Sequence, residues 1–541
     1  METNPIAGRA RSAGRVRSNR PLLVAAILCG VFLRVLYFNV DRFHADEALY
    51  AGWALLARQD PLLIDVPVDK PPLYLYTLVA STRIWGSSEF ALRLPNLAAS
   101  TLGIALVYRL GRRLYDQTTA LWSAWFVALS PFDILFARTV FTDPILVMWM
   151  LCALCAAAEG RWFWMGAGLG LAFATKQHAV LLIPLVLAAG LIQNQAGRSR
   201  TAAGRHWRPA LAAVAGFALP YGATMAWDSA RWAVRPGYWK QSALSYGGLI
   251  WAPLARWGER TAEWLSWARY LVGSPLLGVL LLGGCALLLI RGWRVGHACS
   301  VTRLDTLFIA YALGYLGLHT VLQFSIWDRY LLPLVPLVGL LLARTVSVAD
   351  HGAAVHSAAD HSAADRVRAA DHGAADRVRA ADRVRANALA AVMLLLAVWG
   401  GWKAAHNGYP VGGEHWAYQG LDQVAAYLKQ NAPPDAVLYH HWLRWHYTYY
   451  LYGTDFELRW WESGEHLRRE ALRTPERAQY IVLPDWRTQE PDAEGIRLEP
   501  VYEAHRQDGS VSLRVYRIEL EPAALTQSAV PRSPARTEAG P

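Results

Sequence analysis

The sequence predicts a polytopic α-helical membrane protein of about 11 transmembrane helices with a small C-terminal extracytoplasmic α/β domain. Of the 541 residues, 54% are hydrophobic and only 18% are charged. Apolar runs of about 20 residues, the length that crosses a bilayer as a helix, recur through the first three quarters of the chain. The 25 tryptophans and 24 tyrosines are numbers typical of aromatic belts at two membrane interfaces.

Eleven apolar runs are predicted to span the bilayer, and the N-terminal tail (1–20) sets their orientation. The arginines of the tail place it in the cytoplasm, because basic segments stay on that side. Alternation then puts three more basic loops inside, 111–117, 194–208 and 291–304. The predicted spans are 21–38, 94–110, 118–137, 142–158, 162–175, 177–193, 209–227, 271–290, 305–322, 330–348 and 387–403.

Residues 72–86 decide this alternation. Counted as a span, they would move all three basic loops outside, so we expect a helix lying at the outer interface. The loop 228–270, rich in tryptophan, and the chain after about 404 are then outside. The net charge of +11 is explained by the arginines of the tail and inner loops, so no nucleic-acid partner is expected.

Six segments follow from these patterns. A transmembrane module (21–348) follows the basic tail, and a low-complexity cytoplasmic insertion (349–386), helical or disordered, precedes the last span. In that insertion ADHSAADRVRA is followed by ADHGAADRVRA. The α/β domain (404–521) ends before a tail (522–541) whose Pro/Ala/Ser-rich composition predicts disorder.

The C-terminal domain shows both helical and strand patterns. LDQVAAYLKQN has helical periodicity, while AVLYHH and YIVLPDW are typical strands. LEPVYEAHRQDGSVSLRVYRIEL predicts a hairpin turning at Asp508-Gly509. The run HHWLRWHYTYY is interpreted as a packed or surface aromatic segment, with a histidine metal site as the alternative.

Candidate functional residues begin just after the first span. Asp46 and Glu47 form a carboxylate pair near the bilayer edge, where charges are costly and usually functional. Lys70 returns to the same surface and can hold a phosphate as a point charge. Together they suggest chemistry on a lipid-linked phosphate. The alternatives are that Asp46 caps a helix and that Lys70 only extends its charge to the interface.

Further polar clusters gather on the outer side. Arg138 and Asp143 flank the start of one span, and Arg329 precedes another. Lys176 and His178 lie at the predicted tip of a hairpin. A cap at the start of the following helix is the alternative for Asp143, and interface anchoring is the alternative for both arginines.

Six sequence blocks resemble polyprenol-phosphate-sugar-dependent glycosyltransferases of the GT-C superfamily, in particular bacterial protein O-mannosyltransferases and lipid A aminoarabinose transferases. The blocks are HADEALYAGWALL, DKPPLYLYTL, SEFALRLPNLAASTLGIALVYRLGRRLY, LSPFDILFARTVFTDPILVMWM, LAFATKQHAVLLIPL and WDRYLLPLVPL. The resemblance implies a seven-span module with juxtamembrane helices, in the inner membrane of a bacterium, with its active site outside. His178 departs from the pattern, which leaves the roles of Lys176 and His178 uncertain.

The resemblance also implies a mechanism. A sugar would leave a polyprenyl phosphate in a reaction that inverts the anomeric carbon, and its acceptor would be a protein, a lipid or a glycan. Asp46 matches the catalytic base. Glu47 is expected to assist Asp46, to bind a metal ion or to orient the acceptor, and a solvated carboxylate at the start of a helix is the alternative. Lys70, Arg138 and Arg329 are candidate ligands of the donor phosphate. A divalent metal ion shared by Asp46, Glu47 and Asp143 is a possible cofactor.

Two other functions share parts of this pattern. A transporter or flippase for a lipid-linked glycan should show inverted repeats and charged groups near the midplane of the bilayer. The sequence shows neither. A ligase or polymerase acting on lipid-linked glycans would share the topology but lack the early carboxylate pair. Neither the sugar nor the acceptor can be identified from the sequence.

Overall fold

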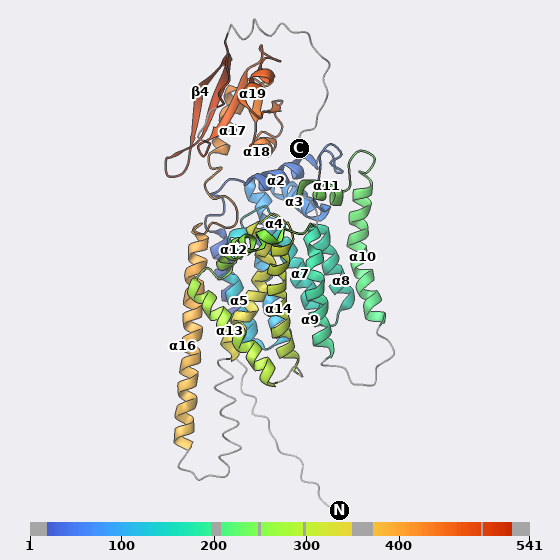
Figure 1. Ribbon diagram of the computed structural model, residues 1–541, viewed down its shortest axis with the longest axis vertical. Helices are drawn as coiled ribbons and strands as arrows, with labels where there is room; N and C mark the ends of the chain where they lie inside the picture. The colour runs from blue at the N-terminus through green and yellow to red at the C-terminus, as the bar shows by residue number, and fades with distance from the viewer. Residues whose placement is uncertain are drawn as a thin grey trace, which may run out of the picture.

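The computed structural model describes residues 19–195, 207–246, 250–295, 299–348, 372–487 and 491–521. The helices form a bundle, and an α/β domain stands on one end of it (Figure 1). Two short helices, α2 (Ala45–Leu56) and α3 (Pro72–Trp85), lie across that end, between the bundle and the domain. The predicted combination of a helical membrane module with a small α/β domain is therefore confirmed.

The bundle contains seven helices that are long and apolar enough to cross a membrane, among the residues described. These are Glu89–Leu114, Gln177–Gln195, Trp207–Ser229, Pro275–Arg294, Ser300–Val321, Asp328–Val348 and Val384–Ala405. Two shorter apolar helices accompany them, α7 (Asp143–Ala158) and α8 (Trp162–Thr175). The protein is thus a multi-pass membrane protein, and the count of eleven spans remains a prediction.

In chain order, the bundle helices include α1 (Arg20–Val35), α4 (Glu89–Leu114) and α9 (Ile183–Gln195), the last preceded by the 3₁₀ turn η1 (Gln177–Leu182). Later in the chain come α10 (Trp207–Ser229), α13 (Pro275–Val295), α14 (Ser300–Val321), the 3₁₀ segment η4 (Asp328–Leu334) and α16 (His372–Ala405). Helix α16 begins inside the predicted insertion and continues through the last predicted span. Residues 349–371 lie outside the described part of the chain, as do the N-terminal tail up to residue 18 and the tail from 522.

The predicted span 118–137 is wrong as a single helix. It consists of α5 (Gln117–Ala128) and α6 (Pro131–Phe136), with Ser130 in an extended conformation between them. Proline disfavours helical backbone in the residue before it, which explains the break. Arg34 fills the break: its guanidinium donates to the carbonyls of Val127 and Ala128 at the end of α5 and pairs with Asp133 in α6 at 2.5 Å.

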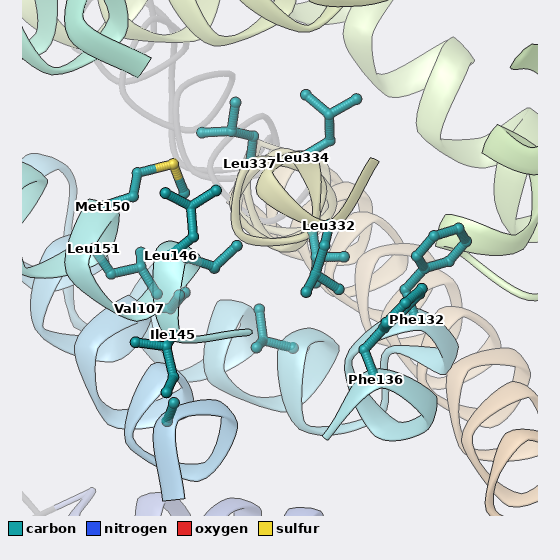
Figure 2. Packing of buried hydrophobic residues seen from close by; sticks show 14 of the residues in the cluster. Val107, Phe132, Phe136, Ile145, Leu146, Met150, Leu151, Leu332, Leu334 and Leu337 are labelled. Carbon is teal, nitrogen blue, oxygen red and sulfur yellow. The ribbon is translucent and has the colours of Figure 1, made fainter. Parts of the chain in front are cut away.

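The hydrophobic core of the bundle lies where α4, α6, α7 and the segment after η4 meet (Figure 2). Its side chains are aliphatic or aromatic and almost completely buried. Figure 2 labels ten of them: Val107, Phe132, Phe136, Ile145, Leu146, Met150, Leu151, Leu332, Leu334 and Leu337. This core holds the starts of α7 and η4 next to each other, which positions the polar residues at both starts.

The segment between α10 and α13, predicted as an outer loop, folds into short helices. They are α11 (Tyr238–Tyr246), η2 (Leu254–Arg256), α12 (Trp257–Ala268) and η3 (Arg269–Leu271). Helix α11 lies at the same end of the bundle as α2, α3 and the α/β domain (Figure 1). This end therefore gathers α2, α3 and α11.

The C-terminal domain is built on one five-stranded sheet in the order β2-β1-β3-β5-β4. Strands β1 (Val437–His440), β2 (Glu457–Trp460) and β3 (Gln479–Pro484) are parallel. Strands β4 (Ile496–His505) and β5 (Val511–Leu520) form a hairpin, and β5 pairs antiparallel with β3. Three helices complete the domain: α17 (Leu421–Asn431), α18 (Arg444–Tyr450) and α19 (Gly464–Ala471).

The predicted helix, strands and Asp508-Gly509 turn are confirmed. Gly509 adopts φ +84°, a backbone conformation that glycine tolerates well. Strand β2 and helices α18 and α19 were not predicted. The domain boundaries drawn from sequence remain predictions.

The domain docks on α2 and on the segment between α1 and α2. Helix α18 packs against α2, and the Nε2–H of His446 donates to the carbonyl of Phe43 at 2.9 Å. Asp41 accepts hydrogen bonds from Asn407 and His415, which lie between α16 and α17. Arg42 pairs with Asp422 of α17 at 3.0 Å. These contacts connect the domain to the segment that carries the carboxylate pair.

Candidate functional site

Helix α2 begins with a capping box that separates the roles of Asp46 and Glu47. The Nδ1 of His44 accepts from the backbone N–H of Asp46 at 3.1 Å, and Glu47 Oε2 accepts from the backbone N–H of His44 at 2.9 Å. Glu47 Oε1 accepts from the N–H of Val140 at 2.6 Å. Burial raises the pKa of Glu47, against the lowering influence of Arg93 and of these N–H groups. Glu47 thus joins α2 to the segment before α7.

Asp46 is not the cap, since His44 fills that position. Its Oδ2 lies 2.8 Å from Nη2 of Arg329, and its side chain stays 29% exposed while that of Arg329 is 7% exposed. The guanidinium also lies 4.8 Å from the ring centre of Phe141 and 4.7 Å from that of Trp327. The structure therefore gives Asp46 a fixed, partly open carboxylate beside a buried cation.

Asp143 forms a second pair, with Lys176. Lys176 Nζ lies 2.7 Å from Asp143 Oδ1, and both side chains are almost completely buried. The ammonium also lies over the ring of Tyr330 at 4.6 Å. Burial lowers the pKa of Lys176 to about 8, and Asp143 opposes that shift. The side chain of Asp143 does not cap α7, because it pairs with Lys176 instead.

Lys70 forms a third pair. Its Nζ lies 2.6 Å from Oδ2 of the preceding residue, Asp69. It also lies 3.4 Å from the hydroxyl of Tyr246 and 4.7 Å from the centre of that ring. Burial, Asp69 and Asp46 all raise the pKa of Tyr246. Tyr246 therefore stays neutral and can donate a hydrogen bond from its hydroxyl.

Lys70 and Lys176 line one cavity of about 330 Å³. Apart from these two, the wall is mainly apolar, as in sites that hold lipid or other small ligands. The remaining lining residues are Gln177, His178, Val180, Leu181, Trp239, Ser242, Ala243, Tyr246, Phe324 and Tyr330. Two of the five lysines of the whole chain thus meet in one apolar pocket.

The three ion pairs lie within electrostatic range of one another. Arg329 and Lys70 both contribute to lowering the pKa of Lys176, and Asp46 contributes to raising that of Tyr246 in the cavity wall. Three cations and three carboxylates therefore share one low-dielectric region, where each interaction is stronger than in water. Such a region can hold an anion and also offers a carboxylate base.

His178 lies in the cavity wall next to Lys176. Its ring stacks on Tyr330 with centres 4.6 Å apart, and its Nε2 lies 3.4 Å from Nε2 of His319. The Nδ1–H of His319 donates to the carbonyl of Tyr315 at 2.8 Å, so in neutral His319 the Nε2 accepts from His178. The remaining nitrogen of His178, Nδ1, is then an acceptor.

Arg138 lies elsewhere. It donates to the carbonyl of Leu36 after α1, to those of Ala404 and Ala405 at the end of α16, and to Asn407. These are carbonyls that a helix end leaves without intrahelical partners. The geometry therefore gives Arg138 a role in joining two helix ends, which disfavours the prediction that it binds phosphate.

The three carboxylates proposed for a metal ion also lie in different environments. Asp46 pairs with Arg329, Asp143 with Lys176, and Glu47 accepts from backbone N–H groups. In the part of the chain that the structure describes, no group of three or more histidine, cysteine, aspartate or glutamate residues could hold a metal ion. The residues as arranged do not fit a shared cation, and the metal ion remains a prediction.

Several cavity residues were not singled out from sequence. Tyr246 and Ser242 come from α11, and Gln177 donates both to the carbonyl of Asp69 and to Ser242. Trp239 is one of the tryptophans of loop 228–270, and the sequence offered no reason to choose it among them. The DKPP block and the lysine of ATKQH were the signals that led to the cavity.

Comparison with known proteins adds a family match. Residues 69–221 match the family model described as dolichyl-phosphate-mannose-protein mannosyltransferase. The chain is 26% identical over 197 residues to undecaprenyl phosphate-alpha-4-amino-4-deoxy-L-arabinose arabinosyl transferase 2 of Proteus mirabilis. That alignment covers 31% of this chain and only 35% of the relative.

Two solved structures share the fold over most of the chain. ArnT from Cupriavidus metallidurans bound to undecaprenyl phosphate gives a TM-score of 0.56 at 16% identity, covering 92% of this chain and 97% of that one. The Archaeoglobus fulgidus oligosaccharyltransferase in complex with Zn and sulfate gives a TM-score of 0.50 at 11% identity. That alignment covers 86% of this chain and 68% of the oligosaccharyltransferase chain. At these identities the likeness concerns the fold.

Proposed function

We propose that this chain, whose fold and family match are those of the GT-C glycosyltransferases, moves a sugar from a polyprenyl phosphate to an acceptor on the extracytoplasmic face of a bacterial inner membrane. The observation that carries this proposal is the apolar cavity lined by Lys70 and Lys176 beside the Asp46–Arg329 pair. The Proteus mirabilis relative is named for an undecaprenyl phosphate sugar, and ArnT was solved with undecaprenyl phosphate bound, which supports a donor of this class.

The cavity suits the donor in two ways. Its apolar wall can take the first isoprene units of the lipid, and the two ammonium groups can take the phosphate. Charge on the phosphate grows as the bond to the sugar breaks, so cations fixed in a low-dielectric site stabilise the transition state. Arg329 adds a third cation within range of Lys176.

Asp46 is the proposed base. It takes the proton of the acceptor hydroxyl while the acceptor oxygen bonds to the anomeric carbon and the bond from that carbon to the phosphate oxygen breaks. Attack from the side opposite the phosphate inverts the anomeric carbon. Arg329 keeps the Asp46 carboxylate in place. Glu47 is left out of the reacting groups, because backbone N–H groups occupy both its oxygens.

The alternative functions fit this arrangement less well. A flippase needs charged groups that serve a path through the bilayer. Here the three ion pairs gather at one end of the bundle, together with α2 and α11. A base of the Asp46 type has no task in transport.

A direct test incubates the purified protein with a panel of polyprenyl-phosphate sugars and follows donor loss by mass spectrometry. Wild-type protein should consume at least one donor. Lys70→Met should weaken donor binding and slow transfer together, whereas Lys70→Arg should retain part of both. Lys240→Met is the matched control, since Lys240 lies on α11 but is exposed and outside the cavity wall.

Two results would count against the proposal. One is no loss of any donor by well-folded wild-type protein. The other concerns the phosphate site: equal kinetics for the Lys70→Met and Lys240→Met variants would remove Lys70 as a phosphate ligand and show that it serves only the interface. The acceptor is proposed only as a protein, lipid or glycan hydroxyl, and a divalent metal ion should be tested in the same assay by adding a chelator.

A further inference from the structure

The C-terminal domain carries a row of aromatic side chains at one edge of its sheet. Because β1, β2 and β3 are parallel, their carboxyl ends, His440, Trp460 and Pro484, meet at that edge. His441 and Trp442 follow β1 directly, and Trp486 lies two residues after the end of β3. The edge therefore collects rings from three separate segments.

These rings touch one another. The centres of Trp442 and Trp486 lie 5.6 Å apart in an edge-to-face arrangement, and those of His441 and Trp442 lie 4.0 Å apart. The ring of His441 stacks near that of Trp460 with centres 6.1 Å apart. The order Trp460, His441, Trp442, Trp486 makes a continuous row, which we name the aromatic row.

The row remains open to solvent. Trp442, Trp460 and Trp486 are 38%, 42% and 44% exposed. Exposed apolar surface that is gathered in one place usually marks a binding site. In the described part of the chain after residue 406, the exposed large hydrophobic residues are all tryptophans, the fourth being Trp416. A surface that enters a membrane normally includes exposed leucine or phenylalanine too.

Polar groups accompany the rings. The Nδ1–H of His441 donates to the carbonyl of Trp461 at 2.8 Å, so Nε2 of the neutral ring is an acceptor. The guanidinium of Arg487 lies over Trp442 at 4.3 Å and over Trp461 at 4.6 Å. Flat apolar faces with hydrogen-bonding groups at their rims match the two sides of a sugar ring, since its C–H groups suit an indole face and its hydroxyls suit polar rims.

The position of the aromatic row in the sheet is also typical of a ligand-binding site. The strand order β2-β1-β3 reverses between β1 and β3, because the chain passes from β2 across β1 to reach β3. Open α/β sheets bind ligands outside the carboxyl ends of their strands at such a reversal. Trp442 and Trp486 follow the two strands that flank it.

We propose that the aromatic row is a carbohydrate-binding site that takes consecutive sugar rings of a neutral glycan chain. This site is separate from the cavity of Lys70 and Lys176, and the proposal does not rest on the transfer reaction. Tryptophans dominate the energetics of such contacts, so removing one ring should be costly.

The test uses the full chain in lipid nanodiscs, titrated with chitohexaose, mannohexaose and maltohexaose and monitored by isothermal titration calorimetry. Wild-type protein should bind at least one of these hexasaccharides. Trp442→Ala and Trp486→Ala should each weaken that binding tenfold or more. Trp416→Ala, an exposed tryptophan of the same domain outside the row, should change it less than twofold.

Folding is checked by thermal melting, and turnover of a polyprenyl-phosphate sugar should persist in Trp442→Ala. Absence of binding to all three hexasaccharides would overturn the proposal, as would equal affinities for wild type and Trp442→Ala. A further measurement in nanodiscs that contain brominated lipids tests whether the aromatic row faces the bilayer. If bromine quenches Trp442 and Trp486 fluorescence, measured as the difference from the alanine variants, the row faces the bilayer and the glycan site is refuted.

Discussion

Asp46 and Arg329 are separated by 283 positions in the chain, yet their carboxylate and guanidinium lie 2.8 Å apart. The pair joins the start of α2 to the start of η4, and Phe141 supports the guanidinium from the segment before α7. Three distant segments therefore fix the orientation of one partly exposed carboxylate.

Asp46→Asn should lower turnover about a hundredfold or more, the usual scale for loss of a general base. The amide keeps the size and part of the hydrogen bonding of the carboxylate but cannot take the acceptor proton. Donor affinity should change little, because the phosphate contacts are assigned to the lysines. Steady-state kinetics with a polyprenyl-phosphate sugar measure both quantities. Near-normal turnover would eliminate the role of Asp46.

Lys176 gives the reaction a dependence on pH. Burial lowers its pKa to about 8 in the free protein, so its positive charge is present below that pH and lost above it. We expect kcat/KM for the donor to fall as pH rises through about 8, since kcat/KM reports the free enzyme. In Lys176→Arg this decrease should move to higher pH or vanish, because arginine keeps its charge. If kcat/KM of Lys176→Arg falls at the same pH as that of wild type, the pH dependence belongs to a group other than Lys176.

Glu47→Ala should destabilise the protein. The substitution leaves the buried N–H of Val140 and the N–H of His44 without their acceptor. Each unsatisfied buried donor costs about 1–3 kcal/mol, so a clear fall in melting temperature in detergent is expected. Glu263→Ala, on the exposed surface of α12, is the control and should melt like wild type. An unchanged melting temperature for Glu47→Ala would show that these hydrogen bonds of Glu47 contribute nothing to the stability of the protein.

Arg138→Gln separates a structural role from phosphate binding. The variant loses hydrogen bonds to carbonyls at the ends of α1 and α16, so its melting temperature should fall. The donor KM of the folded fraction should stay close to that of wild type. A rise in KM comparable to that of Lys70→Met, without loss of stability, would restore Arg138 as a phosphate ligand.

Cysteine labelling in a variant that lacks the native cysteines can test the predicted orientation of the helices in the membrane. Single cysteines at the exposed positions Lys240 and Glu465 should react with an impermeant maleimide applied to the outside of intact cells. Cysteines at Arg112 and Arg208 should react only after the cells are opened, because the predicted basic loops face the cytoplasm. If the cysteine that replaces Arg112 reacts from outside intact cells, the predicted orientation of the helices is wrong.

Much of the fold was predictable because hydrophobic periodicity reports local structure. The amphipathic pattern of α17 and the alternation of β4 and β5 are such signals. The break at Pro131 carried a local signal too, but the apolar run around it concealed two helices. Helix α18 had no clear period. It is stabilised by packing on α2, a tertiary contact that no local pattern reports.

The site was predictable to the extent that rare residue types marked it. Lys70 and Lys176 were noticeable because lysine is scarce in this chain. The division between Asp46 and Glu47 was not predictable, since it depends on their directions from the helix. Successive side chains point about 100° apart, which sends Glu47 into the core and Asp46 toward Arg329. The pairing of Lys176 with Asp143 likewise needed the folded chain.

The three ion pairs make the resting site electrically balanced, with three cations against three carboxylates. A sugar phosphodiester brings one negative charge, and the phosphate monoester left after transfer carries up to two. In the proposed reaction, the proton taken by Asp46 leaves the protein side with one net positive charge at the same moment. The product dianion would then lie in a site that has just become cationic. We therefore expect release of the spent lipid to be coupled to the departure of that proton to water.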